Sequence, residues 1–228
     1  EENNRVFEAL QYEAVKASME LAKERGAYPT FAGSTWSQGF VTPFTSDRDW
    51  EMDKAQWAKW RTLGDQVKEF GIRNSNITAI APTATISNIC GTSACIEPGY
   101  QRVYMDENKS GYFKVVAPDY EANPKSFKSA FEIDQKWLIR AAAIRQRWID
   151  QSQSLNLFRK PGTKGREISD WYFLAWELGC KTTYYLRDFT EHKDFKKLGK
   201  TTDKPEDDTE EPSVMLCSIN NPDCESCQ

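Results

Sequence analysis

The stretch from Asn76 to Ser87 has the sequence NITAIAPTATIS. Its first half, Asn76–Ala81, is a short apolar run typical of a strand, and Pro82–Ser87 then leads into a predicted helical turn. Hydroxyl groups and the free backbone N–H groups of a helix start can bind an anion, and small residues let a phosphate approach closely. Thr and Ser before a helix are also common as simple caps. These residues alone leave both interpretations open.

Helical patterns flank this stretch on both sides. Apolar residues at helical spacing predict helices over about Asn4–Arg25, Asp47–Phe70, Phe131–Ser154 and Asp170–Leu178. Ser46 and Ser169 are the expected N-caps of the second and fourth. A glycine predicts the end of three of them, at Gly26, Gly71 and Gly179. The predicted buried stripes are Trp50, Trp57, Trp60, Leu63 and Val67 in the second helix, and Trp137, Leu138, Ala141, Ile144 and Trp148 in the third.

Extended segments are predicted elsewhere in the chain. Val103–Met105 and Tyr112–Val116 have the pattern of a β-hairpin across the turn at residues 108–111. Lys181–Leu186 is short, apolar and aromatic, which predicts a buried strand. Tyr28–Phe44 is rich in Gly, Ser, Thr and Pro and predicts a loop.

Length, composition and charge exclude several classes of protein. A chain of 228 residues suffices for one sizeable domain or two small ones. It contains no run of 18 apolar residues, so we expect no transmembrane helix. We expect no signal peptide either, and the start at Glu1 indicates a crop or a processing point. A net charge of −4 argues against broad, direct binding of nucleic acid.

The end of the chain differs from the rest. Residues 188–228 are strongly acidic and lack apolar periodicity, so we expect a flexible, disordered tail. It ends in the pair Cys224 and Cys227, with Cys217 upstream. Such a pair can close a small disulfide ring. Six cysteines are too sparse for a disulfide scaffold, and their spacing indicates redox or metal chemistry in a reducing compartment. About 37 residues separate Arg187 from Cys224, which as a flexible leash spans on the order of 30–35 Å.

Two alternatives compete with a redox role for these cysteines: half a zinc site and an idle tail. Zinc needs four ligands, and the single histidine, His192, would complete the set only through an improbable loop. We therefore predict no metal site. The other cysteines, Cys90, Cys95 and Cys180, are interpreted as ordinary small buried residues.

Adjacent tyrosines, Tyr184 and Tyr185, lie in the predicted strand after the fourth helix. Such residues usually serve packing, and in a regular strand they point to opposite faces. A functional role needs a local distortion that brings the rings together. Two neighbouring phenols could then pass an electron, with each proton moving to its neighbour.

Several motifs occur in an order that is highly specific when taken together. They are Phe31-Ala32-Gly33-Ser34, Gly71-Ile72-Arg73-Asn74-Ser75, Ala81–Ser87, Ile96-Glu97-Pro98, Phe131–Trp137, Ile149–Asn156 and Lys181–Arg187. With them, essentially the whole chain resembles the C-terminal portion of the large, catalytic subunit of class I ribonucleotide reductase. This family reduces ribonucleoside diphosphates to deoxyribonucleoside diphosphates for DNA synthesis.

The resemblance implies a fold and a role for each matching position. The fold would be α/β: the later strands and helices of a ten-stranded barrel over residues 1–187, incomplete on its own, followed by the tail at 188–228. Substrate diphosphate would be held by Pro82, Thr83, Ala84, Thr85, Ile86 and Ser87. A radical would pass from Tyr185 to Tyr184 and on to an active-site cysteine. Cys224 and Cys227 would be the dithiol shuttle.

The resemblance also implies partners. The radical-bearing cysteine, the active-site cysteine pair and the allosteric nucleotide domain have no counterpart here, so we expect a missing N-terminal part to supply them and the chain to be inactive alone. A small subunit would carry a dinuclear metal radical cofactor, and thioredoxin or glutaredoxin would re-reduce the shuttle. No cofactor would bind this segment directly, and the enzyme would be cytoplasmic.

Two alternatives remain beside this hypothesis. A fragment of an adenosylcobalamin-dependent reductase shares the barrel but generates its radical on the cofactor and needs no tyrosine relay. A non-catalytic interaction module that binds other reductase subunits would need neither the tyrosines nor the tail cysteines.

Overall fold

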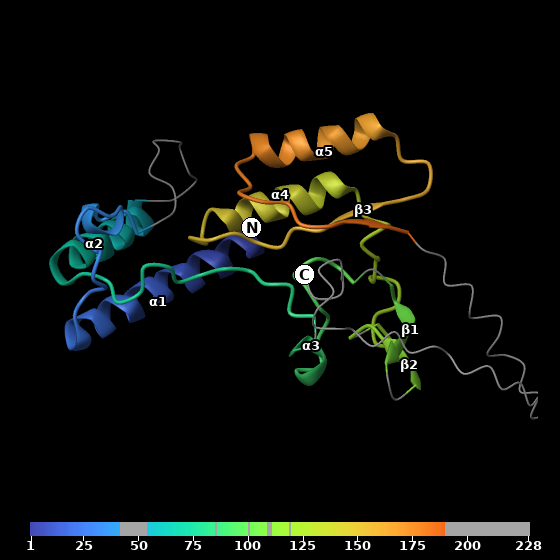
Figure 1. Cartoon of the computed structure of the whole chain (residues 1–228), viewed down its shortest axis with the longest axis horizontal. Coiled ribbons are helices and arrows are strands. Elements are labelled where there is room, and N and C mark those ends of the chain that lie inside the picture. The colour runs from blue at the N-terminus through green and yellow to red at the C-terminus, as the bar shows by residue number, and fades with distance from the viewer. Residues whose placement is uncertain (42–53, 85, 100, 109–110, 119, 190–228) are drawn as a thin grey trace, which may run out of the picture. The chain divides into compact units, whose positions relative to one another are not determined.

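A computed structural model describes residues 1–41, 54–84, 86–99, 101–108, 111–118 and 120–189, which all belong to one unit, Glu1–Phe189 (Figure 1). Several predictions lie outside these residues. They are the N-cap Ser46, the first residues of the second helix with Trp50, the position of Thr85, and the acidic tail from residue 190.

The first two helices form a common core. Helix α1 spans Glu2–Arg25 and helix α2 spans Lys54–Phe70. Each ends at the predicted glycine, Gly26 with φ 78° and Gly71 with φ 79°, a left-handed backbone that a residue without Cβ adopts freely. Buried residues of these helices and of segments packed against them form the core: Val15, Met19, Trp36, Val41, Trp60, Leu63, Val67, Ile72 and Trp148. Trp57, predicted to be buried with them, is 43% exposed, so that prediction was wrong.

Helix α4 spans only Gln135–Gln146, much shorter than the predicted Phe131–Ser154. It begins at Asp134, whose carboxylate accepts a hydrogen bond from the backbone N–H of Lys136 at 2.9 Å. It ends at Gln146, and the residues beyond bind a distant segment: the Asp150 carboxylate accepts hydrogen bonds from the backbone N–H groups of Ile77 and Thr78. The residues after Asp150 are thereby drawn into extended pairing. Trp137, predicted to be buried, is 63% exposed.

Helix α5 spans Gly165–Glu177 and begins five residues before the predicted start. Ser169 is therefore not its N-cap. The backbone N–H groups of Glu167 and Ile168 both donate to the carbonyl of Lys164, which starts the helical pattern there. The end at Gly179, with φ 81°, agrees with the prediction. Short helical segments are also present: a 3₁₀ turn at Trp36–Gln38 inside the predicted loop, and α3 at Ile86–Ile89.

Three extended segments lie side by side in parallel. Strand β3, Leu157–Arg159, pairs with β4, Leu186–Asp188. The predicted strand Asn76–Ala81 is reduced to one bridge, between Ile80 and Gln153. The segment 152–159 is therefore the central one, with residues 78–80 on one edge and residues 184–189 on the other. The predicted strand Lys181–Leu186 starts only at Leu186 and is not buried, which corrects that prediction.

Helices α4 and α5 lie on one side of this parallel pair (Figure 1). The core between them is formed by Ile139, Ala142, Leu155, Leu157, Trp171 and Ala175. A smaller cluster beside it contains Ala130, Phe131, Leu138 and Phe158. Large apolar side chains stay exposed on α5, where Trp176 is 78% and Phe173 66% accessible.

The predicted hairpin is present. Strand β1, Val103–Asn108, pairs antiparallel with β2, Gly111–Val116, in a register that sets Val103 opposite Val116. The predicted combination of helices and strands is thus present. Within the described ranges, however, the strands form two separate two-stranded sheets and no closed barrel.

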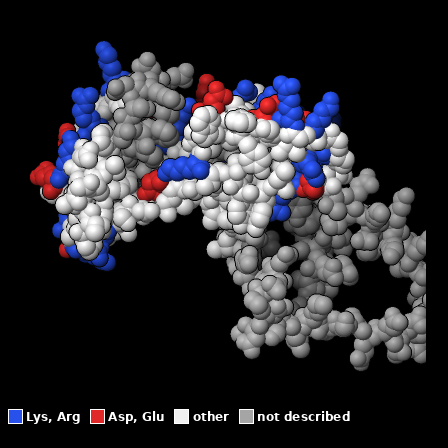
Figure 2. All heavy atoms as spheres, turned by 45° about the horizontal axis from the view of Figure 1, so that its top comes forward, with Lys and Arg blue, Asp and Glu red and all other residues white. Residues whose placement is uncertain are grey.

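Two sequence-based expectations, that the chain does not bind nucleic acid broadly and has no transmembrane helix, concern its surface charge and its helices. On the face in Figure 2, Lys and Arg side chains alternate with Asp and Glu and do not merge into one basic stretch. None of the helices in the described part of the chain has the length and apolar character required to span a bilayer.

Replacement of a fully buried core isoleucine should destabilise the chain far more than replacement of an exposed one. Ile139, on α4, is 0% exposed in the core that α4 shares with β3 and α5, whereas Ile89 is 83% exposed. We expect Ile139→Ala to lower the free energy of unfolding by about 2–5 kcal/mol. The matched control Ile89→Ala should change it by less than about 0.5 kcal/mol. Urea unfolding followed by circular dichroism measures both, and equal effects would contradict this assignment of the core.

Candidate functional site

A closed loop follows the bridge residue Ile80. At its base, the backbone N–H of Cys95 donates to the carbonyl of Pro82 at 2.8 Å and to the hydroxyl of Thr83 at 3.2 Å. Thr83 and Cys95 have φ of 53° and 64°, the left-handed region that β-branched and other non-glycine residues rarely adopt. Residues 82–97 are called the 82–97 loop below.

The predicted anion-binding residues occupy the first part of this loop. Thr83 and Ala84 are exposed, and Ile86 is 58% exposed. Ser87 is 3% exposed, and its hydroxyl donates to the carbonyl of Ala84 at 3.2 Å. The Ser87 side chain therefore holds the loop in shape, while Thr83 is an exposed residue whose hydroxyl accepts from Cys95 N–H and keeps its own hydrogen free to donate.

The two tyrosines do not alternate as in a regular strand. Tyr184 and Tyr185 directly precede β4, and their ring centroids are 4.0 Å apart with an interplanar angle of 47°. The hydroxyl of Tyr184 donates to the hydroxyl of Tyr185 at 3.1 Å. The structure thus contains the local distortion that an electron-passing pair requires. Both side chains are about half exposed in this chain.

The hydrogen bond within the pair and the neighbouring Arg187 both affect the tyrosines. The hydrogen bond to Tyr185 raises the pKa of Tyr184, because the donated proton is held in the neutral pair. The guanidinium of Arg187 lies 5.2 Å from the centroid of the Tyr185 ring, within the range of a cation–π contact.

Backbone pairing fixes both tyrosines to the central segment. The N–H of Tyr184 donates to the carbonyl of Leu155 at 2.7 Å, and the N–H of Leu157 donates to the carbonyl of Tyr185 at 2.8 Å. Asn156 lies between these two contacts and reaches the 82–97 loop as well. Its backbone N–H donates to Glu97 at 2.8 Å, and its side-chain amide lies 3.3 Å from the same carboxylate. The loop and the tyrosine pair therefore meet at Asn156.

Sequence reasoning assigned no role to Glu97 or Asn156. Glu97 is 5% exposed and Asn156 1% exposed, an unusual place for two polar side chains. Both belong to motifs that carried the family resemblance, Ile96-Glu97-Pro98 and Ile149–Asn156, which was the only signal available.

The described cysteines differ from one another. Cys90 is exposed, which corrects its interpretation as a buried residue, whereas Cys95 and Cys180 are half-buried. Burial, reinforced by the nearby Glu97 carboxylate, raises the pKa of Cys95. Burial raises the pKa of Cys180 to about 11. Cys217, Cys224, Cys227 and His192 lie outside the described residues. Among those that are described, no group of three or more His, Cys, Asp or Glu side chains could hold a metal ion.

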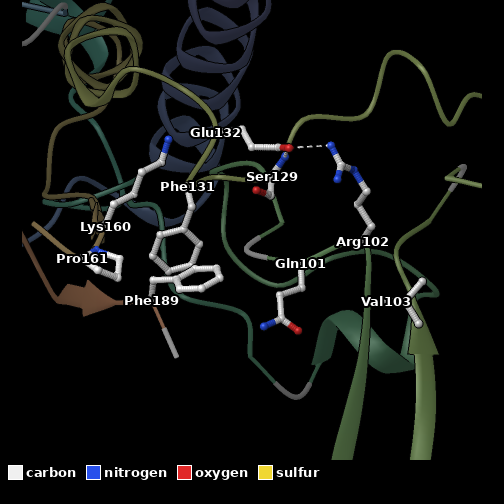
Figure 3. Close-up of a pocket in the computed structure, with 9 residues that line it drawn as sticks. All are labelled: Gln101, Arg102, Val103, Ser129, Phe131, Glu132, Lys160, Pro161 and Phe189. Atoms are coloured by element: carbon white, nitrogen blue, oxygen red, sulfur yellow. Dashed lines mark hydrogen bonds and ion pairs between the residues drawn. The ribbon is translucent and has the colours of Figure 1, made fainter. Parts of the chain in front are cut away.

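A cavity of about 660 Å³ lies elsewhere, at the carboxyl ends of β3 and β4 (Figure 3). The rings of Phe131 and Phe189 pack edge to face there at 5.2 Å. Across the cavity, Arg102 binds both carboxylate oxygens of Glu132 at 2.7 Å, and the pKa of Glu132 is lowered by the Ser129 N–H and this guanidinium. None of the site residues predicted from the sequence lines this cavity.

Comparison with known proteins gives one consistent result. Residues 1–186 match the family model described as "Ribonucleotide reductase, barrel domain". The chain is 42% identical over 190 residues to the ribonucleoside-diphosphate reductase subunit alpha of Helicobacter pylori, an alignment that covers 80% of this chain and 24% of that protein.

Relatives from other bacteria agree. The ribonucleoside-diphosphate reductase subunit alpha of Chlamydia trachomatis is 34% identical over 87% of this chain and 23% of its own length. That of Synechocystis is 35% identical over 85% of this chain and 27% of its own length. The chain thus spans about a quarter of the length of the curated relatives it matches. The match of the family model to most of the chain, together with these identities, shows that the chain belongs to the ribonucleotide reductase barrel-domain family.

Proposed function

We propose that this chain is the C-terminal part of the large subunit of a ribonucleoside-diphosphate reductase. Residues 1–187 would contribute to the catalytic barrel, and residues 188–228 would form a flexible tail. The complete enzyme would convert ribonucleoside diphosphates to deoxyribonucleoside diphosphates by radical chemistry. The observation that carries the proposal is the hydroxyl-to-hydroxyl contact of Tyr184 and Tyr185 at 3.1 Å.

This contact suits the transfer of a hydrogen atom between phenols. In the first step, Tyr185 gives one electron to the oxidant of the small subunit and its phenolic proton to solvent or to a base of that subunit, and becomes a phenoxyl radical. Tyr184 then loses one electron and its proton, and the proton moves along the existing hydrogen bond, because Tyr184 is the donor. Tyr185 returns to a neutral phenol and Tyr184 becomes the radical. Tyr184 would pass it to an active-site cysteine on the part of the subunit outside this chain.

The 82–97 loop supports a role in holding substrate. Pro82, Thr83, Ala84, Thr85, Ile86 and Ser87 are the candidate diphosphate ligands, through the Thr83 hydroxyl and backbone N–H groups. The left-handed backbone of Thr83, φ 53°, is a strained conformation of the kind that clusters at binding sites.

The tail cysteines complete the proposed cycle. Each turnover oxidises a cysteine pair in the active site to a disulfide. Cys224 and Cys227 would reduce it by thiol–disulfide exchange and become a disulfide themselves, and thioredoxin or glutaredoxin would restore both thiols. A leash of the estimated length lets one pair visit both the active site and the external reductant.

The remaining partners follow from the same proposal. The dinuclear metal radical cofactor belongs to the small subunit, and the nucleotide effectors bind the part of the large subunit outside this chain. We place the enzyme in the cytoplasm. The tyrosine contact favours this proposal over an adenosylcobalamin-dependent reductase, which needs no relay, and over an interaction module without chemistry.

Removal of either relay hydroxyl should abolish turnover. Tyr184→Phe and Tyr185→Phe keep the rings but remove the O–H bond whose hydrogen is transferred. We expect diphosphate reduction by the complete large subunit, assayed with its small subunit, to fall to background. Tyr172→Phe, at a partly exposed tyrosine on α5 that is not a member of the pair, is the matched control and should retain activity. Normal turnover by Tyr184→Phe would contradict the relay and favour the adenosylcobalamin alternative.

Loss of the Thr83 hydroxyl should weaken substrate binding. Thr83→Val keeps the shape of the side chain, and the bond from Cys95 N–H to the Pro82 carbonyl still closes the loop. We expect KM for the diphosphate to rise about tenfold with little change in kcat, the effect of one lost hydrogen bond to a charged ligand. Thr62→Val on α2 is the control, since the Thr62 hydroxyl only bonds within its own helix. An unchanged KM would count against the 82–97 loop as the diphosphate site.

The shuttle should be separable from the chemistry. Replacement of both Cys224 and Cys227 by Ser removes the exchangeable thiols and leaves the 82–97 loop and the tyrosines intact. We expect a single turnover by the pre-reduced enzyme, measured by rapid quench, and no further turnover with thioredoxin. Cys90→Ser, at an exposed cysteine, is the control and should turn over repeatedly. Repeated turnover by the double variant would exclude the shuttle and leave the interaction module as the better hypothesis for the tail.

A further inference from the structure

The backbone N–H of Asn156 has no hydrogen-bond acceptor in the neighbouring segment of the parallel pairing. Ser154 N–H donates to the carbonyl of Ile80 at 3.0 Å, so alternate N–H groups of the central segment face that edge. Asn156 N–H is the next to face it. The neighbouring segment no longer offers an acceptor, because the Pro82 carbonyl, next in the register, accepts from Cys95 N–H at 2.8 Å, and Thr83 turns away with φ 53°. A buried N–H without a partner is costly, so another acceptor is required.

Glu97 is that acceptor. One of its carboxylate oxygens accepts the Asn156 backbone N–H at 2.8 Å, and the other lies 3.3 Å from the Asn156 side-chain nitrogen. Glu97 follows Cys95, which closes the 82–97 loop, by two positions. It therefore links that loop to the central segment. Because the carboxylate oxygens act here only as acceptors, the NH₂ group of Asn156 must face them.

This orientation of the Asn156 side chain also determines which of its atoms faces Tyr185. With its nitrogen toward Glu97, Asn156 presents its carbonyl oxygen to the backbone N–H of Tyr185, at 3.4 Å. The same nitrogen lies 3.5 Å from the sulfur of Cys95. One buried amide therefore contacts the loop on one side and the second tyrosine on the other.

We propose that Asn156, oriented by Glu97, is a positioning residue that couples the 82–97 loop to the Tyr184–Tyr185 pair. Neither residue touches substrate or carries the radical. Glu97 sets the direction of the Asn156 amide, and the amide holds the backbone of Tyr185 where its hydroxyl meets that of Tyr184. The role in turnover rests on the proposed function, whereas the contact itself does not.

An exchange of donor and acceptor tests this coupling. Glu97→Gln leaves one acceptor oxygen for two donors, so the amide of Asn156 loses its fixed direction. Asn156→Asp brings two carboxyl groups face to face. In the double variant, the new amide at position 97 would accept from the backbone N–H of residue 156 and donate to the new carboxylate at position 156. The second oxygen of that carboxylate would still accept from Tyr185 N–H. The double variant also keeps the total charge.

Two readouts are measured on the complete large subunit with its small subunit. We expect each single variant to lower kcat at saturating diphosphate about tenfold or more, and the double variant to return to within about threefold of the parent. Hydrogen exchange at Tyr185 N–H should accelerate about tenfold in each single variant and slow again in the double variant. Glu167→Gln, an exposed carboxylate on α5, is the charge control and should change neither.

The outcomes separate coupling from general stability. A purely structural pair would reduce the amount of folded enzyme but not kcat per folded molecule. Unchanged exchange at Tyr185 in both single variants, or a double variant no better than the worse single, overturns the proposal. A parent enzyme without diphosphate reduction would refute the proposed function, and the exchange measurement would still decide whether the Glu97–Asn156 contact holds Tyr185.

Discussion

The backbone hydrogen bonds of the central segment, residues 152–159, organise the candidate site, because the N–H and C=O groups on both of its edges need partners. On one edge it pairs with Ile80, and on the other it pairs with Tyr184, Tyr185 and β4. The first pairing sets where the 82–97 loop begins, and the second sets where the tyrosines lie. The two elements with proposed functions are thus neighbours because each borders the same segment.

The carboxylate of Glu97 completes this arrangement where regular pairing stops. It replaces the strand that leaves at Pro82, and it supplies the acceptors that Asn156 needs in a buried position. Such a polar contact stabilises only in one orientation, whereas apolar packing there would tolerate several. The exposure of both tyrosines and of Trp176 on α5 agrees with a piece of a larger catalytic barrel, which is the assembly we propose.

Local signals in the sequence predicted part of the fold and little of the geometry of the site. Glycines gave correct ends for α1, α2 and α5, because a left-handed residue stops a helix without help from distant contacts. The predicted extension of α4 to Ser154 was wrong because the backbone N–H groups of Gln151 and Ser154 pair with carbonyls of residues 78–80, far away in the sequence. Likewise, the sequence pattern could not show that the rings of Tyr184 and Tyr185 meet, because it placed both residues inside a regular strand, whereas β4 begins after them. Nor could it show that Glu97 binds Asn156.

The central claim is that this chain supplies the loop and the tyrosine pair of a ribonucleoside-diphosphate reductase. Its most direct test is an assay of the complete large subunit that contains this chain, with a small subunit whose radical has been verified by electron paramagnetic resonance and with thioredoxin as reductant. We predict that a ribonucleoside diphosphate is converted to its deoxyribonucleoside diphosphate, detected by chromatography, only when both subunits are present. No deoxyribonucleotide despite an intact small-subunit radical would contradict the account.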